Sequence, residues 1–391
     1  MEQPQHQQES QNPSLSHLFI SFLRLGATAF GGPAMVAYIR KMSVEKKHWL
    51  DDPSARDGVA LCQTIPGATA MQMSAYIGFR TRGLGGAAAS FIGFGLPAFL
   101  FMMILSALYA RTHTLPAVVS AFNGLQAIVV ALVANATLSF GRASIKNWRN
   151  VINALIAAGL FGLKVSPILV IIIAAFLGMI LYNREPVLPA AIPTKKAHAP
   201  KSFVLLLLAT GIGFGLLFFL DRKLFDLTTL MFRIDLFAFG GGFASVPLMF
   251  YEIVQVRSWM DGPTLLNGIV LGQVTPGPIV ITATFIGYLL KGPLGGLLAT
   301  VCVFLPSFMI VVGIVPYFDR LRSSPYFKKV ITGIFCSFVG LLLTVTIRFA
   351  LDIPWDLPRT LLTIAAFVAL ILKVDILWVV LIGTAVSLIV L

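Results

Sequence analysis

The sequence is poor in charged residues, which make up 12% of its 391 positions, about half of the fraction that soluble domains carry. Hydrophobic residues make up 57%. Apolar runs recur along the chain, including 203–220, 294–315 and 361–391, and each is near or above the ~20 residues that a helix needs to cross a bilayer. This composition excludes a single soluble core. It predicts an all-α polytopic protein, multi-pass in the cell (inner or plasma) membrane and surrounded by the lipid bilayer.

Cysteine and histidine are also scarce. Cys62, Cys302 and Cys336 lie in apolar surroundings without a CxxC spacing, so neither a disulfide framework nor a zinc site is indicated. The five histidines fall in the polar N-terminal tail or in loops, and the sequence contains no GxSxG motif and no P-loop. We therefore predict no metal, no cofactor and no enzymatic activity. Transport is then driven by an ion gradient or by the substrate's own gradient.

Acidic residues are fewer than basic ones, which gives a net charge of +13. The basic residues are scattered through short loops and form no single stripe, so nucleic acid is not expected as a partner. Positive loops of a membrane protein mainly set its orientation. They also raise the local concentration of anions, which favours a small anion as the substrate.

The chain contains an internal repeat. Residues 24–33 align with residues 233–242 at a spacing of 209 positions. The same spacing, or one residue more, pairs Trp49 with Trp259, Pro66-Gly67 with Pro276-Gly277, and Pro97 with Pro306. A chance match would not keep this register, so we predict two homologous transmembrane halves.

The repeat divides the chain into four segments. They are a disordered polar tail (1–14), a first transmembrane repeat (15–182), a linker (183–223) with one extra apolar helix (203–220), and a second transmembrane repeat (224–391). Each repeat ends in two short apolar stretches, split by Lys164 in one half and by Lys373 in the other. These stretches form either two thin crossings or one broken crossing.

Loop charge predicts the relative orientation of the halves. Basic residues gather in loop 40–56 of the first half, and in loop 320–329 of the second half. The equivalent loop of the opposite half contains a single arginine in each case, Arg257 and Arg111. Because basic loops stay on one side of the membrane, this exchange predicts an inverted-topology repeat. The extra helix between the halves supplies the additional crossing that inversion requires.

Each half carries two interruptions rich in glycine and proline, at 30–33 and 64–67 in the first half and at 239–242 and 274–278 in the second. Such breaks are tolerated in a membrane only where the freed backbone groups find other partners. A broken helix also exposes the N–H groups at the N-terminus of its second part, which attract anions. Breaks at equivalent positions of two repeats therefore predict a substrate site at the repeat interface.

The predicted site combines these breaks with uncharged hydroxyl and amide side chains, which suit an oxyanion that must be bound and then released. Close helix packing is the alternative explanation for any single glycine or threonine. The predicted substrate-binding residues are Arg24, Phe30, Gly31, Gly32, Pro33, Gln63, Thr64, Pro66, Gly67, Thr69, Gln72, Arg233, Phe239, Gly240, Gly241, Gly242, Gln273, Thr275, Pro276, Gly277, Pro278 and Thr282.

Three ionisable residues lie within apolar stretches near the breaks. Arg24 and Arg233 occupy the same repeat position, and a charge within a span is costly enough to suggest a function. A guanidinium group binds an oxyanion with two parallel hydrogen bonds, whereas the alternative is that Arg24 extends to the membrane interface. We predict that Asp235 carries a coupling proton or neutralises Arg233, and the two roles are compatible.

The FGGP motif of residues 30–33, its copy FGGG at 239–242, and the segments LCQTIPG (61–67) and QVTPGP (273–278) resemble the chromate ion transporter family in its two-domain form. The resemblance covers nearly the whole chain after the tail. It implies a secondary carrier, an antiporter that exports chromate and is coupled to protons. The first half departs from the more usual Pro-Gly-Pro by having Ala68. Uptake or exchange of sulfate or a similar dianion and an anion channel are the alternatives, and a homodimer is compatible with the sequence.

Overall fold

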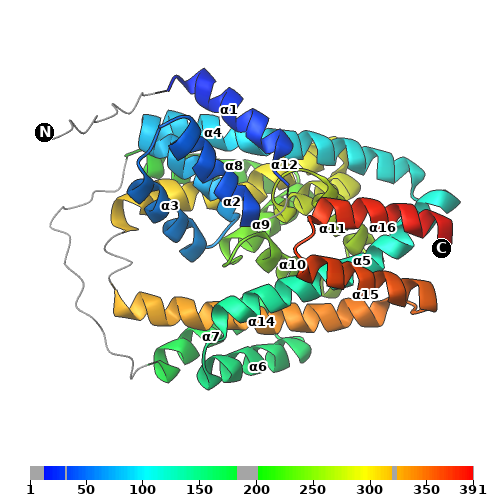
Figure 1. Ribbon diagram of the computed structural model, residues 1–391. Helices are drawn as coiled ribbons and strands as arrows, with labels where there is room; N and C mark the ends of the chain where they lie inside the picture. The colour runs from blue at the N-terminus through cyan, green and yellow to red at the C-terminus, as the bar shows by residue number, and fades with distance from the viewer. Residues whose placement is uncertain (1–12, 31–32, 183–200, 319–323, 391) are drawn as a thin grey trace, which may run out of the picture.

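The computed structural model describes residues 13–30, 33–182, 201–318 and 324–390. These residues form helices and connections without a regular β-strand. Five helices among them are long and apolar enough to cross a membrane. The predicted all-α polytopic class is therefore confirmed, and Figure 1 shows the long helices packed side by side.

The helices of the two halves follow each other in the same order. The first half contains α1 (Leu15–Thr28), α2 (Pro33–Arg40), the π-helical η1 (Lys41–Lys46), α3 (Asp52–Thr64), α4 (Thr69–Thr112), α5 (Pro116–Ser144), α6 (Trp148–Gly162) and α7 (Pro167–Leu181). The extra helix is α8 (Lys201–Leu220). The second half contains α9 (Arg222–Leu236), η2 (Gly242–Ala244), α10 (Ser245–Met249), the π-helical η3 (Phe250–Val256), α11 (Gly262–Val274), η4 (Ile279–Ile281), α12 (Thr282–Ile314), η5 (Val315–Tyr317), α14 (Pro325–Asp352), α15 (Leu357–Ile371) and α16 (Ile376–Val390).

Equivalent helices begin with the same capping chemistry in both halves. The side chain of Asp51 accepts a hydrogen bond from the Ser54 N–H and caps α3. Asp261 accepts one from the Thr264 N–H and caps α11. Each cap satisfies an N–H group that has no partner inside its helix. The repeat in sequence is therefore a repeat in local structure.

Helices α4 and α12 each contain a sharp reversal. Ser90 Oγ donates to the carbonyl oxygen of Ser74 over 2.8 Å, although the two residues would lie about 24 Å apart along a straight helix. The chain turns back at Gly83, whose φ is +59°. In α12 the hydroxyl groups of Thr284 and Thr300 approach to 2.6 Å in the same way. Each element is therefore a short helix folded back on a long one.

The short helices at the end of each half lie side by side. The chain reverses at Lys164, which has a φ of +64°, and the Tyr182 hydroxyl near the end of α7 donates to Asn150 Oδ1 at the start of α6 over 2.6 Å. Lys373 has the same φ between α15 and α16. Each half therefore ends in two short helices that form a hairpin and do not follow each other along one axis.

Equivalent long helices of the two halves run antiparallel. Thr137 of α5 and Thr346 of α14, which are related by the repeat spacing, bring their hydroxyl oxygens to 3.3 Å. Gly141 further along α5 lies against Val339, which is earlier in α14. The order of these contacts shows opposite directions, and Figure 1 shows the two helices adjacent. Thr137 and Thr346 therefore lie close to a pseudo-twofold axis.

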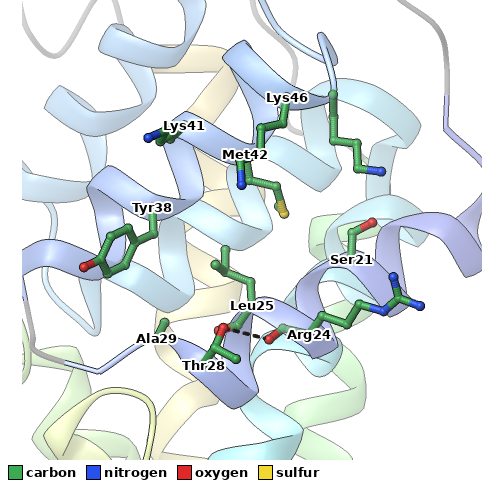
Figure 2. A pocket seen from close by; sticks show the side chains of 10 residues that line it. Ser21, Arg24, Leu25, Thr28, Ala29, Tyr38, Lys41, Met42 and Lys46 are labelled. Carbon is green, nitrogen blue, oxygen red and sulfur yellow. Dashed lines mark hydrogen bonds between the residues drawn. The ribbon is translucent and has the colours of Figure 1, made fainter. Parts of the chain in front are cut away.

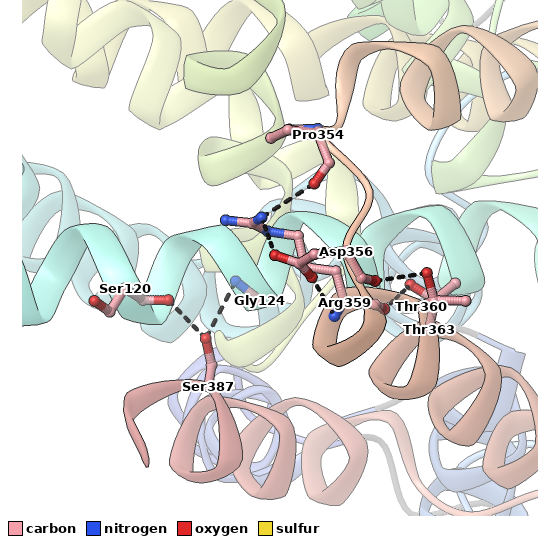
Figure 3. A network of polar contacts seen from close by, with 8 residues as sticks. All are labelled: Ser120, Gly124, Pro354, Asp356, Arg359, Thr360, Thr363 and Ser387. Carbon is pink, nitrogen blue, oxygen red and sulfur yellow. Dashed lines mark hydrogen bonds and ion pairs between the residues drawn. The ribbon is translucent and has the colours of Figure 1, made fainter. Parts of the chain in front are cut away.

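Each long helix is covered by the hairpin of the opposite half. Helices α6 and α7 pack on α14, whereas α15 and α16 pack on α5. Figure 3 shows one of these contacts, in which Ser387 Oγ of α16 accepts from the Gly124 N–H at 3.2 Å and donates to the Ser120 carbonyl at 2.6 Å. Neither half can bury its apolar faces alone, so the two fold as one body.

Candidate functional site

The breaks of the two halves meet through reciprocal hydrogen bonds. The Gly67 N–H donates to the Ala238 carbonyl over 2.9 Å, and the Gly277 N–H donates to the Ala29 carbonyl over 3.1 Å. Ala29 and Gly67 are the repeat equivalents of Ala238 and Gly277, so each half makes the same bond to the other. The backbone groups freed by the breaks thus find partners across the repeat interface.

Glycine is required at the centre of this contact. Gly67 and Gly277 have φ values of +118° and +113°, a backbone region that residues with a side chain rarely adopt. A Cβ atom at Gly67 would also lie 2.2 Å from Ser307 Oγ. Both the conformation and the close packing therefore exclude larger residues.

A cavity of about 200 Å³ lies beside the breaks. Four helical N-termini reach it: Met35 lies in the first turn of α2, Thr69 begins α4, Gly242 begins the helical segment Gly242–Val256 with η2, and Ile279 begins the segment Ile279–Ile314 with η4. The first N–H groups of a helix have no acceptor inside that helix, and they concentrate partial positive charge. Their convergence on one cavity favours an anion there.

Polar side chains complete the lining. Gln63 and Gln273, which are repeat equivalents, come from the ends of α3 and α11. Gln273 Nε2 is buried and has no hydrogen-bond partner among the described residues, although a buried donor without a partner is costly. Thr275 also lines the cavity, and its hydroxyl donates to the Gly272 carbonyl over 3.0 Å. The free amide donor of Gln273 is suited to a ligand oxygen.

The structure brings many of the predicted site residues together at this cavity. They are Gln63, Thr69, Gly240, Gly241, Gly242, Gln273, Thr275, Gly277 and Pro278.

Other predicted residues shape the backbone around the cavity without lining it. Pro66 pairs with Phe239 in an isolated antiparallel bridge. Gln72 is buried and donates to the Pro66 carbonyl. The hydroxyls of Thr64 and Thr282 donate to the carbonyls of Ala60 and Ile279.

Phe30 is half-buried and Pro276 is buried. Pro33 begins α2, and Gly31 and Gly32 lie outside the described residues.

The two predicted arginines lie away from the cavity. Arg233 Nη2 is 3.3 Å from Glu252 Oε1, and Arg257 pairs with the same carboxylate. The ion pair of Arg233 is therefore made with Glu252, which the sequence reasoning did not identify. Arg24 lines a separate cleft between α1 and η1 (Figure 2). Contact of either arginine with a transported anion stays a prediction.

Asp235 is fully buried beside the break at residues 64–67. Its Oδ2 accepts hydrogen bonds from the N–H (2.9 Å) and the Oγ (2.6 Å) of Ser307, and Ser307 Oγ accepts from the Ala68 N–H at 2.8 Å. Asp235 Oδ1 has no partner among the described residues. The repeat equivalents of Asp235 and Ser307 are Gly26 and Ala98. This polar connection to a break therefore exists on one side of the pseudo-twofold axis only.

Phe140 was not predicted, and it lies where the cavity meets a wider vestibule. The vestibule has a volume of about 700 Å³, contains Lys146 and Lys328, and shares Gln63, Phe140 and Gly240 with the cavity. A phenylalanine near the end of an apolar span carries no sequence signal that distinguishes it from a lipid-facing residue. The cavity therefore borders a cationic vestibule at Phe140.

Two repeats with equivalent broken helices, joined around a polar cavity that several helix N-termini face, define a multi-pass membrane protein of the transporter class. The model of the chromate transporter family matches residues 16–179 and again residues 225–388. The chain belongs to this family, and the two matches confirm the two homologous halves.

Several curated proteins are similar over nearly their whole length. An uncharacterised transporter of Methanocaldococcus jannaschii is 46% identical over 375 residues, which cover 95% of this chain and 93% of that protein. A chromate transport protein of Cupriavidus metallidurans is 30% identical over 92% of this chain and 88% of its own length. A chromate transport protein of Pseudomonas aeruginosa is 29% identical over 88% and 83%. No solved structure matches the chain.

Placing a negative charge in the cavity tests whether it binds anions. We expect Gln273→Glu to weaken binding of labelled sulfate or chromate to the purified protein by roughly 10- to 150-fold, because a charge-assisted hydrogen bond is replaced by repulsion. Gln63→Glu is expected to act in the same direction. The control is Thr114→Glu, at an exposed position between α4 and α5. Equal affinities for the three variants and the natural protein would contradict an anion site here.

Proposed function

We propose that this chain is a secondary transporter that exports chromate, or a dianion of similar shape, in exchange for protons. The observation that carries the proposal is the convergence of four helix N-termini and uncharged amide donors on one cavity at the repeat interface. Partial charges of this kind attract a dianion. No lysine or arginine is among the described residues that line the cavity, so a bound anion meets partial charges and can leave again. The names of the relatives from Cupriavidus and Pseudomonas support chromate as the substrate.

One-sided access supports a transporter over a channel. Phe140 connects the cavity to the vestibule. Its repeat equivalent, Phe349, is fully buried and packs on Phe250 with a ring-centroid distance of 5.2 Å. The position equivalent to Phe140 is therefore packed among apolar side chains in the second half. A transporter needs such alternation between two sides, whereas a conducting channel needs both routes open together.

A transport assay separates the candidate functions. In proteoliposomes we expect saturable chromate flux that increases when a pH gradient is imposed, with the Gln273→Glu protein as the inactive control. Sulfate flux that exceeds chromate flux would favour sulfate transport. Currents that do not saturate would favour the channel. Absence of chromate movement with and without the gradient would exclude the proposed substrate.

Asp235 is the residue we propose for proton coupling. It is buried, and Ser307 connects it to Ala68, directly after the break at residues 64–67. A carboxyl group within a span is a common proton carrier. We expect Asp235→Asn to remove stimulation of chromate flux by a pH gradient, while exchange of chromate without a gradient persists. The amide keeps the shape of the side chain but does not titrate.

Size-exclusion chromatography of Asp235→Asn is the control for folding. A variant that fails to fold would assign Asp235 a structural role through Ser307 and Ala68. A variant that keeps full stimulation by the pH gradient would move proton coupling to another residue.

We further propose that residues 15–182 and 224–391 form two units of inverted membrane topology, with the pseudo-twofold axis in the membrane plane. The antiparallel packing of α5 on α14 supports this. Ala117 and Tyr326 are equivalent, exposed residues at the starts of these helices. We expect a membrane-impermeant maleimide to label Ala117→Cys and Tyr326→Cys from opposite sides. Labelling of both from one side would indicate a parallel repeat. The native cysteines are buried.

A further inference from the structure

A second cavity carries an excess of positive charge. It is a cleft of about 450 Å³ between α1 and η1, and Arg24, Lys41, Lys46 and Lys47 line it (Figure 2). Among the residues that the structure describes, no acidic one lines this cleft. It shares no lining residue with the cavity at the breaks, so it is a distinct site.

The four cations of the cleft are not neutralised within the protein. Among the described residues, none of them forms an ion pair with a carboxylate. Lys47 Nζ approaches a neutral partner, His17 Nε2, at 3.2 Å. Like charges that share a cleft repel each other. All four cations are exposed, so they are accessible to an anion from outside the chain.

The second half shows that the repeated fold does not require an unpaired arginine at the position of Arg24. The equivalent of Arg24 is Arg233, which pairs with the buried carboxylate of Glu252. The equivalent of Glu252 in the first half is Ser43, whose hydroxyl donates to the Ile39 carbonyl over 2.9 Å. The same arginine position thus has an internal counter-ion in one half and none in the other.

Two of the three lysines of the cleft are specific to the first half. The repeat equivalents of Lys41 and Lys46 are Phe250 and Gln255, whereas Lys47 is matched by Arg257 at the spacing that pairs Trp49 with Trp259. Arg257 pairs with Glu252, so the first half has two more cations here and no equivalent carboxylate.

The surroundings of the cleft indicate an amphipathic ligand. Leu25 and Met42 form an apolar part of its wall. Tyr38 lines the cleft and is 48% exposed, and Ile20 of α1 is 45% exposed. In a membrane protein, exposed apolar residues of this size face lipid, and tyrosine is frequent at the level of the headgroups. The ligand therefore meets cations at one end and acyl chains at the other.

We propose that this cleft binds the phosphate group of an anionic membrane lipid. Lysine and arginine side chains between membrane helices are a recurring site for such headgroups. The apolar flank distinguishes the lipid from a free oxyanion, which would gain nothing from it. Lipid binding at this cleft does not depend on the substrate proposed above.

The position of the cleft connects it to the breaks. Thr28 and Ala29, at the end of α1, line the cleft. The Ala29 carbonyl accepts the hydrogen bond from Gly277 that joins the two halves. A lipid phosphate in the cleft would therefore hold the end of α1, just before the break at residues 30–33. If the chain transports anions as proposed, anionic lipid should increase the rate of that transport.

Native mass spectrometry of the purified full chain with phosphatidylglycerol tests the proposal. We expect one tightly bound lipid that is lost in the triple variant Lys41→Gln, Lys46→Gln, Lys47→Gln, with an affinity about 100-fold lower. The matched control is Lys164→Gln, Lys223→Gln, Lys373→Gln, which removes the same charge at exposed positions elsewhere. Phosphatidylcholine should not replace phosphatidylglycerol.

Three outcomes would overturn the proposal. They are equal loss of lipid in both triple variants, full retention in the cleft variant, and displacement of phosphatidylglycerol by millimolar sulfate, which would show a site for free oxyanions. Size-exclusion chromatography confirms that each variant is folded. Because the experiment measures lipid binding, its failure is distinct from a failure of the chromate transport assay.

Discussion

The structure depends on one constraint, which is that backbone groups freed by a helix break inside a membrane must find new partners. Here they find them in the opposite repeat, where Gly67 donates to Ala238 and Gly277 donates to Ala29. An unpaired amide in hydrocarbon costs several kcal/mol, so neither half is a complete membrane unit alone. The same contact brings the helix N-termini together, and the cavity that they face follows from it.

Symmetry accounts for the scaffold, whereas the departures from symmetry supply the candidate chemistry. Turns, caps and breaks recur at equivalent positions in both halves. The buried pair Asp235 and Ser307 replaces a glycine and an alanine, which adds a titratable group on one side of the axis. Glu252 forms an ion pair with Arg233 in the second half, whereas Arg24 has no such counter-ion among the described residues. A duplicated fold can thus hold distinct sites at equivalent places.

Packing across the halves limits how the molecule can move. Each long helix, α5 or α14, carries the terminal hairpin of the opposite repeat, so a shift of one long helix displaces elements of both halves. Thr137 and Thr346 touch near the axis, and Phe140 and Phe349 lie one turn beyond them. If the halves are inverted as we propose, rocking about this axis would change the surroundings of the two phenylalanines in opposite directions.

The membrane class, the repeat and the positions of the breaks follow from the amino-acid sequence alone. These properties are local, because hydrophobic run length, capping residues and glycine or proline spacing act within one or two helical turns. Gln63, Gln273, Gly240 and Gly241 were predicted from their repeat positions, and the structure places them at one cavity.

The contacts between side chains of different helices become visible only in the folded molecule. It placed Phe140 in the cavity, Arg24 and Arg233 outside it, and Glu252 beside Arg233. These contacts join residues from different helices, and the sequence contains no periodic signal for them. It also showed that the terminal stretches form hairpins, because a reversal at a single lysine depends on the packing of both helices against the opposite repeat.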